Sequence, residues 1–210
     1  MSFFIRRRNI LRLSAGAATL AVTALGLTSG ARADAGQEAA AELIERTAAQ
    51  VIKLVETQSG AAREAAILRV LQTDFDLDYM VRFALGTHWN QATPEQRERF
   101  TRVAANAEAH AYARRFGQSG GQTLIVDRAT ASSRGAGVSV VDSKLKQSDG
   151  EPLAIRWEVR TEGAGPRIVD IKVGGVSMAM TRRADFNSYI QAHGGKVEPL
   201  IDELEARAKR

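Results

Sequence analysis

The chain has 210 residues, no cysteine and a formal net charge of +5. Residues 1–33 contain five arginines and no acidic residue, so the remainder has 24 basic and 24 acidic residues. This balance gives no electrostatic argument for nucleic-acid binding, and the lack of cysteine excludes stabilisation by disulfides. The remaining residues, about 177, suffice for one sizeable core, so we expect a single domain over residues 34–210.

The first 33 residues have the features of a cleaved export signal. Arginines precede an apolar run at residues 13–27, which is shorter than the roughly 20 residues that cross a bilayer as a helix. Residues 31–33, Ala-Arg-Ala, match the small-x-small pattern of a cleavage site. We predict a signal peptide over residues 1–33, with a retained membrane anchor as the alternative. Residues 7–12 resemble the twin-arginine export signal, and the general secretory route is the second possibility.

Helical patterns dominate the chain up to residue 116. Apolar side chains recur on one face of a first helix from residue 34, which Ser59-Gly60 ends. A second helix follows, and the apolar segment 75–89 predicts a short third helix that Gly86 stops. Residues 93–96, Thr-Pro-Glu-Gln, then start a long helix, because threonine caps, proline suits the first turn and glutamine completes a capping box.

From residue 122 the apolar period changes to two, which is typical of β-strands. Ser177 is expected to cap a helix that ends near His193, and a last helix follows. The short connections predict an α+β domain, in which helices pack over a twisted antiparallel sheet of four or slightly more strands and enclose an apolar cavity. Residues 148–150, Ser-Asp-Gly, predict a tight hairpin. The four predicted strands are residues 124–128, 138–145, 153–160 and 167–173.

One face of the predicted sheet is apolar. Charged residues alternate with apolar ones in both of the last two strands. Because successive strand side chains point to opposite faces, the apolar set lies on one side. A filled core and a hollow one give the same pattern, and our interpretation is that this face forms the wall of a pocket for hydrocarbon.

A serine hydrolase is the alternative function from another class. Residues 175–179, Gly-Val-Ser-Met-Ala, nearly match the G-x-S-x-G nucleophile elbow. That elbow belongs to a parallel sheet, and the later histidine, His193, lies about 24 Å along the helix from Ser177. We therefore interpret Ser177 as a helix cap and expect no catalytic residue.

No metal or cofactor motif was found. Asp74, Asp76 and Asp78 resemble the start of a calcium loop, but Tyr79 and Leu85 occupy the positions that require glycine and glutamate. We interpret the three acids as helix caps and solvated carboxylates. The histidines have no metal-ligand spacing, and no phosphate-binding loop is present, so we expect neither metal nor cofactor.

Several motifs, in the right order, resemble the MlaC/toluene-tolerance family, including its hopanoid-associated branch. One departure is Thr181-Arg182, which stands where the family often has an Asn-Tyr pair. The motifs that carry the resemblance are Phe75-Asp76-Leu77-Asp78-Tyr79-Met80, Leu85-Gly86, Trp89, residues 93–100, Val169-Asp170, Gly175-Val176-Ser177-Met178 and residues 183–186.

The resemblance implies a periplasmic lipid carrier that is not an enzyme. Such proteins move phospholipid between an outer-membrane lipoprotein complex and an inner-membrane ABC transporter. The implied fold holds acyl chains in a deep apolar cavity and leaves the headgroup in water. A hopanoid or other polycyclic lipid is the alternative ligand.

The candidate lipid-binding residues come from the sheet and from the helices. Leu124, Val126, Val138 and Val140 are weaker candidates, because their facing is ambiguous. The sheet candidates are Leu153, Ile155, Trp157, Val159, Val169, Ile171 and Val173. The helical candidates are Tyr79, Phe83, Phe100, Ala104, Ala107, Met178 and Phe186.

Overall fold

The computed structural model describes residues 25–116, 122–133, 135, 137–146 and 150–208. The predicted twin-arginine motif and the first two residues of the predicted Ser-Asp-Gly hairpin lie outside this part. The helices are α1 Leu25–Thr57, α2 Gly60–Asp74, α3 Leu77–Leu85, α4 His88–Gln91, α5 Pro94–Phe116, α6 Met178–Ala192 and α7 Glu198–Ala208. The strands are β1 Thr123–Ala131, β2 Val138–Lys146, β3 Leu153–Arg160, β4 Arg167–Val173 and β5 Val176–Ser177.

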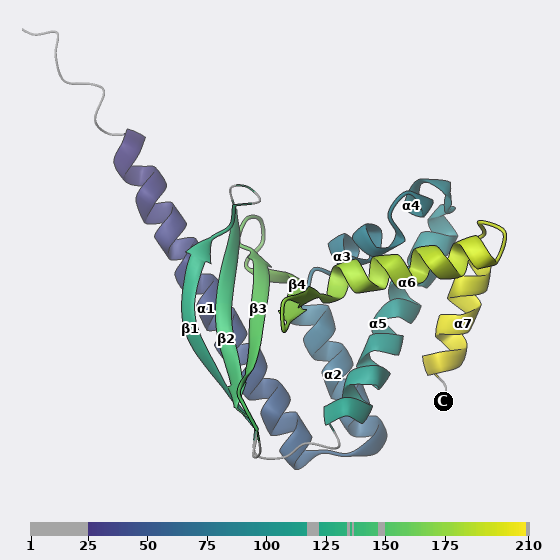
Figure 1. The fold of residues 1–210 in the computed structure, drawn as a ribbon, viewed down its shortest axis with the longest axis horizontal. Helices are drawn as coiled ribbons and strands as arrows, with labels where there is room; N and C mark the ends of the chain where they lie inside the picture. The colour runs from purple at the N-terminus through teal and green to yellow at the C-terminus, as the bar shows by residue number, and fades with distance from the viewer. Residues whose placement is uncertain (1–24, 117–121, 134, 136, 147–149, 209–210) are drawn as a thin grey trace, which may run out of the picture.

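The strands form one antiparallel sheet in the order β1-β2-β3-β4-β5. The prediction of an α+β fold with an antiparallel meander is confirmed, and the short strand β5 is an addition to it. Figure 1 shows the curved sheet on one side of the molecule, with α1 crossing behind it and α3 to α7 gathered beside it. Among the described helices, none is long and apolar enough to cross a membrane.

Strands β1 and β4 each contain an irregularity. In β1 the register shifts between Val126 and Arg128, so Asp127 is an extra residue. In β4, Ile168 pairs with Val159 and Asp170 pairs with Glu158, which makes Val169 the extra residue. Simple alternation of inward and outward side chains therefore fails at this point. Regular pairing would set Val169 opposite Val159, but Ile168 occupies that position and is fully buried. A bulge of this kind bends the strand and increases its twist.

The register of β2 settles the facing of its valines. Val141 and Ser143 pair with Trp157 and Ile155, so they share the inner face of the sheet. Val138 and Val140 alternate with them and lie on the other face. The same outer face holds Asp142, which accepts hydrogen bonds from Arg156 at 2.6 Å and Arg128 at 3.0 Å. These two guanidinium groups, Arg156 first, hold the pKa of Asp142 below its usual value.

Two hydrophobic clusters form the core. The first joins α1, α2 and the inner face of the sheet, with Leu43, Ile44, Val141, Val159 and Ile168 almost fully buried. The second joins helices α3 to α7, and Phe100 and Phe186 meet in it edge to face at a centroid distance of 5.4 Å. Burial of apolar surface in these clusters is the main favourable term in the stability of the fold.

The predicted start of α5 and the predicted end of α3 are found in the structure, whereas α1 begins at Leu25, before the predicted start at residue 34. Thr93 N–H donates to Gln96 Oε1 at 3.0 Å, and Gln96 N–H donates to Thr93 Oγ1 at 3.2 Å, which is the reciprocal capping box at the start of α5. Gly86 ends α3 with a φ of 58°, a conformation that favours glycine. A Cβ at Gly86 would also lie 3.2 Å from the Arg183 side chain, so any larger residue would require that arginine to shift as well.

The acids that resemble a calcium loop have separate structural roles. Asp76 caps α3 by accepting the Tyr79 N–H at 3.0 Å. Asp74, interpreted from the sequence as a cap or a solvated carboxylate, is instead buried: it accepts the Thr47 hydroxyl at 2.6 Å and an Arg46 guanidinium N–H at 3.3 Å. Because Arg46 and Thr47 belong to α1, this carboxylate fixes the end of α2 against α1.

The Thr47 hydroxyl supplies a testable prediction. In Thr47→Val the shape is kept, but the buried carboxylate of Asp74 loses a donor. We expect the free energy of unfolding to fall by about 1–3 kcal/mol, measured by urea denaturation. The control is Thr57→Val, because Thr57 is exposed and we expect a change within about 0.5 kcal/mol there. Equal stabilities for the two variants would contradict the role given to Asp74.

Candidate functional site

Two apolar cavities lie side by side inside the protein. The smaller has a volume of about 140 Å³ and lies between the inner face of the sheet and helices α1 and α2. The larger, about 460 Å³, lies among helices α2, α3, α5 and α6. The larger volume is within the range of about 300–1,000 Å³ that is usual for small-molecule pockets.

The smaller cavity is the one that the sheet lines. Trp157 is fixed in its wall because the indole N–H donates to Ser143 Oγ at 2.9 Å, and Ser143 donates to the carbonyl of Ile155 at 3.1 Å. The polar groups at this cavity belong to Thr47, Glu56 and Gln122. The apolar wall comes from Ala48, Val51, Ile52, Val55, Ile67, Val70, Leu71, Phe75, Leu124, Leu145, Ile155, Trp157 and Ile171.

The larger cavity lies between the two hydrophobic clusters and has no strand residue in its wall. On the α5 side the wall consists of Ala104 and Ala105, whose small side chains do not reach into the space. The buried rings of Phe100 and Phe186 also line this cavity. The remaining apolar wall is Leu71, Phe75, Leu77, Met80, Val81, Ala84, Met178 and Ala179.

Leu71 and Phe75 line both cavities and therefore separate them. The backbone holds Phe75 in place: it is extended, with φ −106° and ψ 148°, and its N–H donates to the Leu71 carbonyl at 3.2 Å. Phe75 also forms an isolated parallel bridge with Ile168 of β4, in which the Asp76 N–H donates to the Ile168 carbonyl at 2.9 Å.

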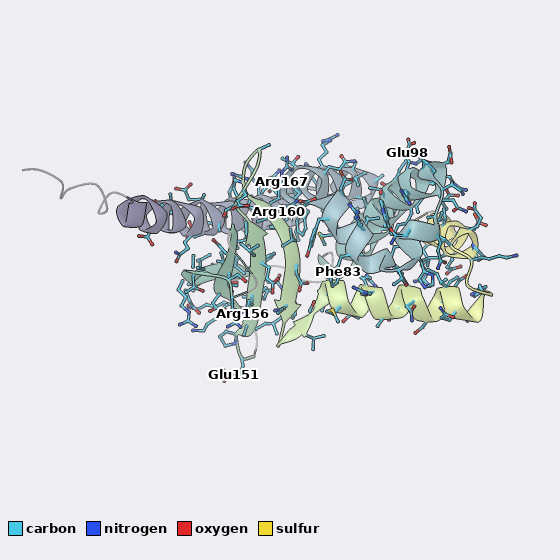
Figure 2. All side chains as sticks on the ribbon, turned by 90° about the horizontal axis from the view of Figure 1, so that it is seen from above. Phe83, Glu98, Glu151, Arg156, Arg160 and Arg167 are labelled. Atoms are coloured by element: carbon cyan, nitrogen blue, oxygen red, sulfur yellow. The ribbon has the colours of Figure 1, made fainter. Side chains whose placement is uncertain are left out.

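Two arginines hold the same segment from the end of the sheet. Arg160 and Arg167 lie opposite each other on β3 and β4, and Figure 2 shows both at one end of the sheet. Arg160 makes an ion pair with Asp76, and Arg167 donates to the Thr73 carbonyl. The wall between the cavities is thus fixed by backbone and ionic contacts as well as by packing.

The larger cavity has a short polar edge. Of the described residues that line it, Arg182 carries the only positive charge and Glu108 the only negative one. Arg182 Nε lies 2.6 Å from Glu108 Oε1, so the pair joins α6 to α5. Thr181, also at this edge, donates its hydroxyl to the Ser177 carbonyl at 2.9 Å. The Arg182 and Glu108 side chains are 41% and 30% exposed, which places this edge at the boundary with water.

The fourteen predicted site residues are divided among several places. Ile155, Trp157 and Ile171 line the smaller cavity, and Phe100, Ala104, Met178 and Phe186 line the larger. The structure does not place the other seven at either cavity. Val159 is fully buried in the first cluster, and Ala107 packs against the second. Val169 is buried beside the bulge, and the half-buried Leu153 and Val173 pair with Leu145 and Ile155.

Tyr79 and Phe83 lie on the outer side of α3. Tyr79 is 41% exposed, and the two rings stack at a centroid distance of 6.2 Å. Arg160 covers the Tyr79 ring and Arg183 covers the Phe83 ring, at 5.4 and 5.2 Å from the centroids. Cation–π contacts of this kind stabilise the surface of α3. Sequence periodicity cannot predict that these rings face outward. It shows which residues share a face of α3, but not whether that face contacts the core or is covered by arginines.

Sequence analysis missed most of the helical wall. Leu71, Phe75 and the α1 residues 51, 52 and 55 were not among the candidate lipid-binding residues, although they line the cavities. Leu124, one of the weaker candidates, lines the smaller cavity. The helical periodicity marks all of these as inward-facing, but the hollow beside them depends on the spacing of helices, which a single sequence does not encode.

Ser177 belongs to a closed hydrogen-bond network at the start of α6. Its hydroxyl donates to Asp170 Oδ2 at 2.6 Å and accepts the Met180 N–H at 3.1 Å. The buried carboxylate of Asp170 also accepts the N–H groups of Ile171 and Ala179, at 2.8 and 3.0 Å. His193 lies at the opposite end of α6, where its ring contacts the Tyr189 carbonyl. The interpretation of Ser177 as a helix cap is confirmed.

These features define a class of protein: an α+β domain in which a twisted antiparallel sheet and its helices leave apolar space inside. A family model described as MlaC protein matches residues 42–206. The chain belongs to the MlaC family, as the sequence motifs indicated. Within the described part of the chain, no group of three or more His, Asp or Glu side chains is arranged to hold a metal ion.

A solved structure has the same fold. It is the phospholipid-binding protein from Ralstonia solanacearum, determined in complex with a phospholipid, and it is 21% identical to this chain with a TM-score of 0.67. The match covers 81% of this chain and 97% of that chain. A comparison with proteins of curated function found no significant match.

The cap at Ser177 generates a prediction that also tests the hydrolase alternative. Ser177→Ala removes one hydrogen bond to Asp170 and one to the Met180 N–H, so we expect the free energy of unfolding to fall by about 1–2 kcal/mol. Ser188→Ala, at an exposed position of α6, is the control and should change stability little. We expect no labelling of the wild-type protein by a fluorophosphonate probe. Labelling that Ser177→Ala abolishes would restore the hydrolase.

Proposed function

We propose that the protein is a periplasmic carrier that binds a phospholipid by its acyl chains and performs no reaction on it. The observation that carries the proposal is the pair of adjacent apolar cavities, of about 140 and 460 Å³, separated by Leu71 and Phe75. Membership of the MlaC family and the phospholipid in the related Ralstonia solanacearum protein support the same function.

The energetics of transfer fit a carrier. Each methylene removed from water contributes roughly 0.8 kcal/mol, so a sixteen-carbon chain gains about 12 kcal/mol on full burial. A protein that moves such a chain through an aqueous compartment must bury most of it. Release then requires a partner that offers an equally apolar site.

The wider assignment extends this proposal. Residues 1–33 act as a signal peptide, removed on export, and residues 34–210 form the carrier domain. The partners are an inner-membrane ABC transporter complex, for which the protein is the substrate-binding component, and an outer-membrane lipoprotein complex. Lipid extraction from the purified protein, followed by mass spectrometry, identifies the ligand directly. A hopanoid in the extract would replace phospholipid as the cargo, and protein that stays free of lipid after incubation with vesicles would refute the carrier.

The larger cavity gives the sharper mutational test. Ala104→Phe fills space that is open in the wild type and should displace at least two methylenes of a bound chain, lowering lipid occupancy about tenfold. Ala184→Phe is the control, because Ala184 is exposed on α6. Native mass spectrometry after incubation with phospholipid vesicles measures the bound fraction. Equal occupancy in the two variants would mean that acyl chains do not enter this cavity.

A charged substitution in the wall of the smaller cavity tests whether lipid enters it. Ile171→Glu places a carboxylate in its apolar wall, where an ionised group is poorly solvated. We expect less bound lipid at pH 8 while the circular dichroism spectrum of the fold persists. Ala154→Glu is the matched control, because Ala154 is an exposed residue of β3 in the same sheet. A normal lipid load in Ile171→Glu would exclude this cavity from the site.

A further inference from the structure

We propose that Arg182 and Glu108 together bind a zwitterionic lipid headgroup, with a phosphate against Arg182 and an ammonium against Glu108. This inference rests on the proposed function and names the lipid class that the cavity takes. The two side chains are the only charged groups among the described residues that line the larger cavity, and they lie in contact at its polar edge.

The position of the pair suits a headgroup better than an acyl chain. Both side chains are partly exposed, whereas the rings of Phe100 and Phe186, which line the same cavity, are buried. An amphiphile that enters with its chains toward these rings leaves its polar end between Arg182 and Glu108. Arginine forms charge-assisted, often bidentate hydrogen bonds with phosphate, which lysine does not reproduce.

Two other places near the cavities, the start of α6 and the smaller cavity, are unsuited to a phosphate. The start of α6 lies near the cavity, but the N–H groups of Ala179 and Met180 already donate to Asp170 and Ser177. The smaller cavity has Glu56 in its wall and no basic residue among its described lining. A phosphate there would face a carboxylate without a compensating cation.

The charge balance of the pair selects for a zwitterion. In the empty protein, Arg182 pairs with two carboxylates, closely with Glu108 at 2.6 Å and more loosely with the exposed Asp185 at 3.7 Å. A phosphate that takes Arg182 leaves Glu108 without this contact, unless the ligand also brings a cation. Phosphoethanolamine supplies both charges and replaces the protein ion pair with two ligand contacts. Phosphoglycerol supplies the anion alone and places it near an uncompensated carboxylate, which is unfavourable.

The adjacent arginine provides a matched control. Arg183 follows Arg182 on α6 but turns to α3, where its guanidinium covers the Phe83 ring at 5.2 Å. It does not line either cavity. A general effect of positive charge on α6 would appear in both arginine variants, whereas headgroup binding is affected by Arg182 alone. On α5, Glu98 is exposed, and Figure 2 shows it away from α6, so it serves as the control for Glu108.

The experiment measures headgroup preference as a ratio. The protein of residues 34–210 and its variants are incubated with vesicles. The vesicles contain equal amounts of phosphatidylethanolamine and phosphatidylglycerol with identical acyl chains. Bound lipid is then extracted and quantified by mass spectrometry. The ratio of the two lipids is insensitive to partial loss of folded protein, so a destabilised variant is still informative.

We expect the wild type to prefer phosphatidylethanolamine about two- to fivefold, the range suited to a partly exposed charge pair. Glu108→Gln should bring the ratio close to one, because the repulsion of the anionic lipid is removed. Arg182→Gln should lower the total load of both lipids about tenfold. Arg183→Gln and Glu98→Gln should behave as the wild type.

Four outcomes oppose the inference, and the loss of the carrier function can be told apart from the loss of the headgroup assignment. A wild-type ratio of one, or a ratio that Glu108→Gln leaves unchanged, overturns the headgroup assignment while the bound lipid upholds the carrier. Equal loss of lipid in Arg182→Gln and Arg183→Gln assigns the effect to surface charge and also overturns it. Absence of both lipids from the wild type refutes the carrier function itself, and the headgroup assignment with it.

Discussion

The short backbone bridge between Phe75 and Ile168 is the contact on which the rest of the structure depends. It attaches the helical half of the molecule to the sheet at the one segment that faces both cavities. Arg160, Arg167 and the buried carboxylate of Asp74 hold the neighbouring residues, so the segment cannot shift without breaking ionic and hydrogen-bonded contacts. Two hydrophobic clusters can then remain apart without collapsing onto each other, and the space between them stays open.

Two acidic groups near the larger cavity, Asp170 and Glu108, have different functions. The carboxylate of Asp170 accepts three hydrogen bonds from its own chain and is buried, so its role is to build the start of α6. Glu108, one helix away, is partly exposed and meets a single guanidinium at the cavity edge. Burial and saturation of hydrogen bonds thus distinguish a structural acid from one that can exchange partners with a ligand.

Most of the fold was predictable because its signals are local. Strand alternation, the Thr93 capping box and the glycine after α3 each act within a few residues, and these elements were predicted. The start of α1 at Leu25 and the short elements α4 and β5 were not. The site was less predictable. The bulge at Val169 interrupts an alternation that looks regular in the sequence, and Tyr79 and Phe83 face outward because arginines cover their rings. The larger cavity depends on the distance between α5 and α6, which no local pattern determines.

The edge strand β1 has a consequence for self-association. An open strand edge can recruit a strand from another molecule, and the half-exposed Ile125 would favour such pairing. The extra residue Asp127 breaks the regular hydrogen-bond spacing, and its carboxylate pairs with Lys144 while Arg128 pairs with Asp142. An incoming strand would therefore meet an interrupted and charged edge. Edge-to-edge pairing with a second molecule is therefore disfavoured, which protects a fold that keeps apolar space open beside its sheet.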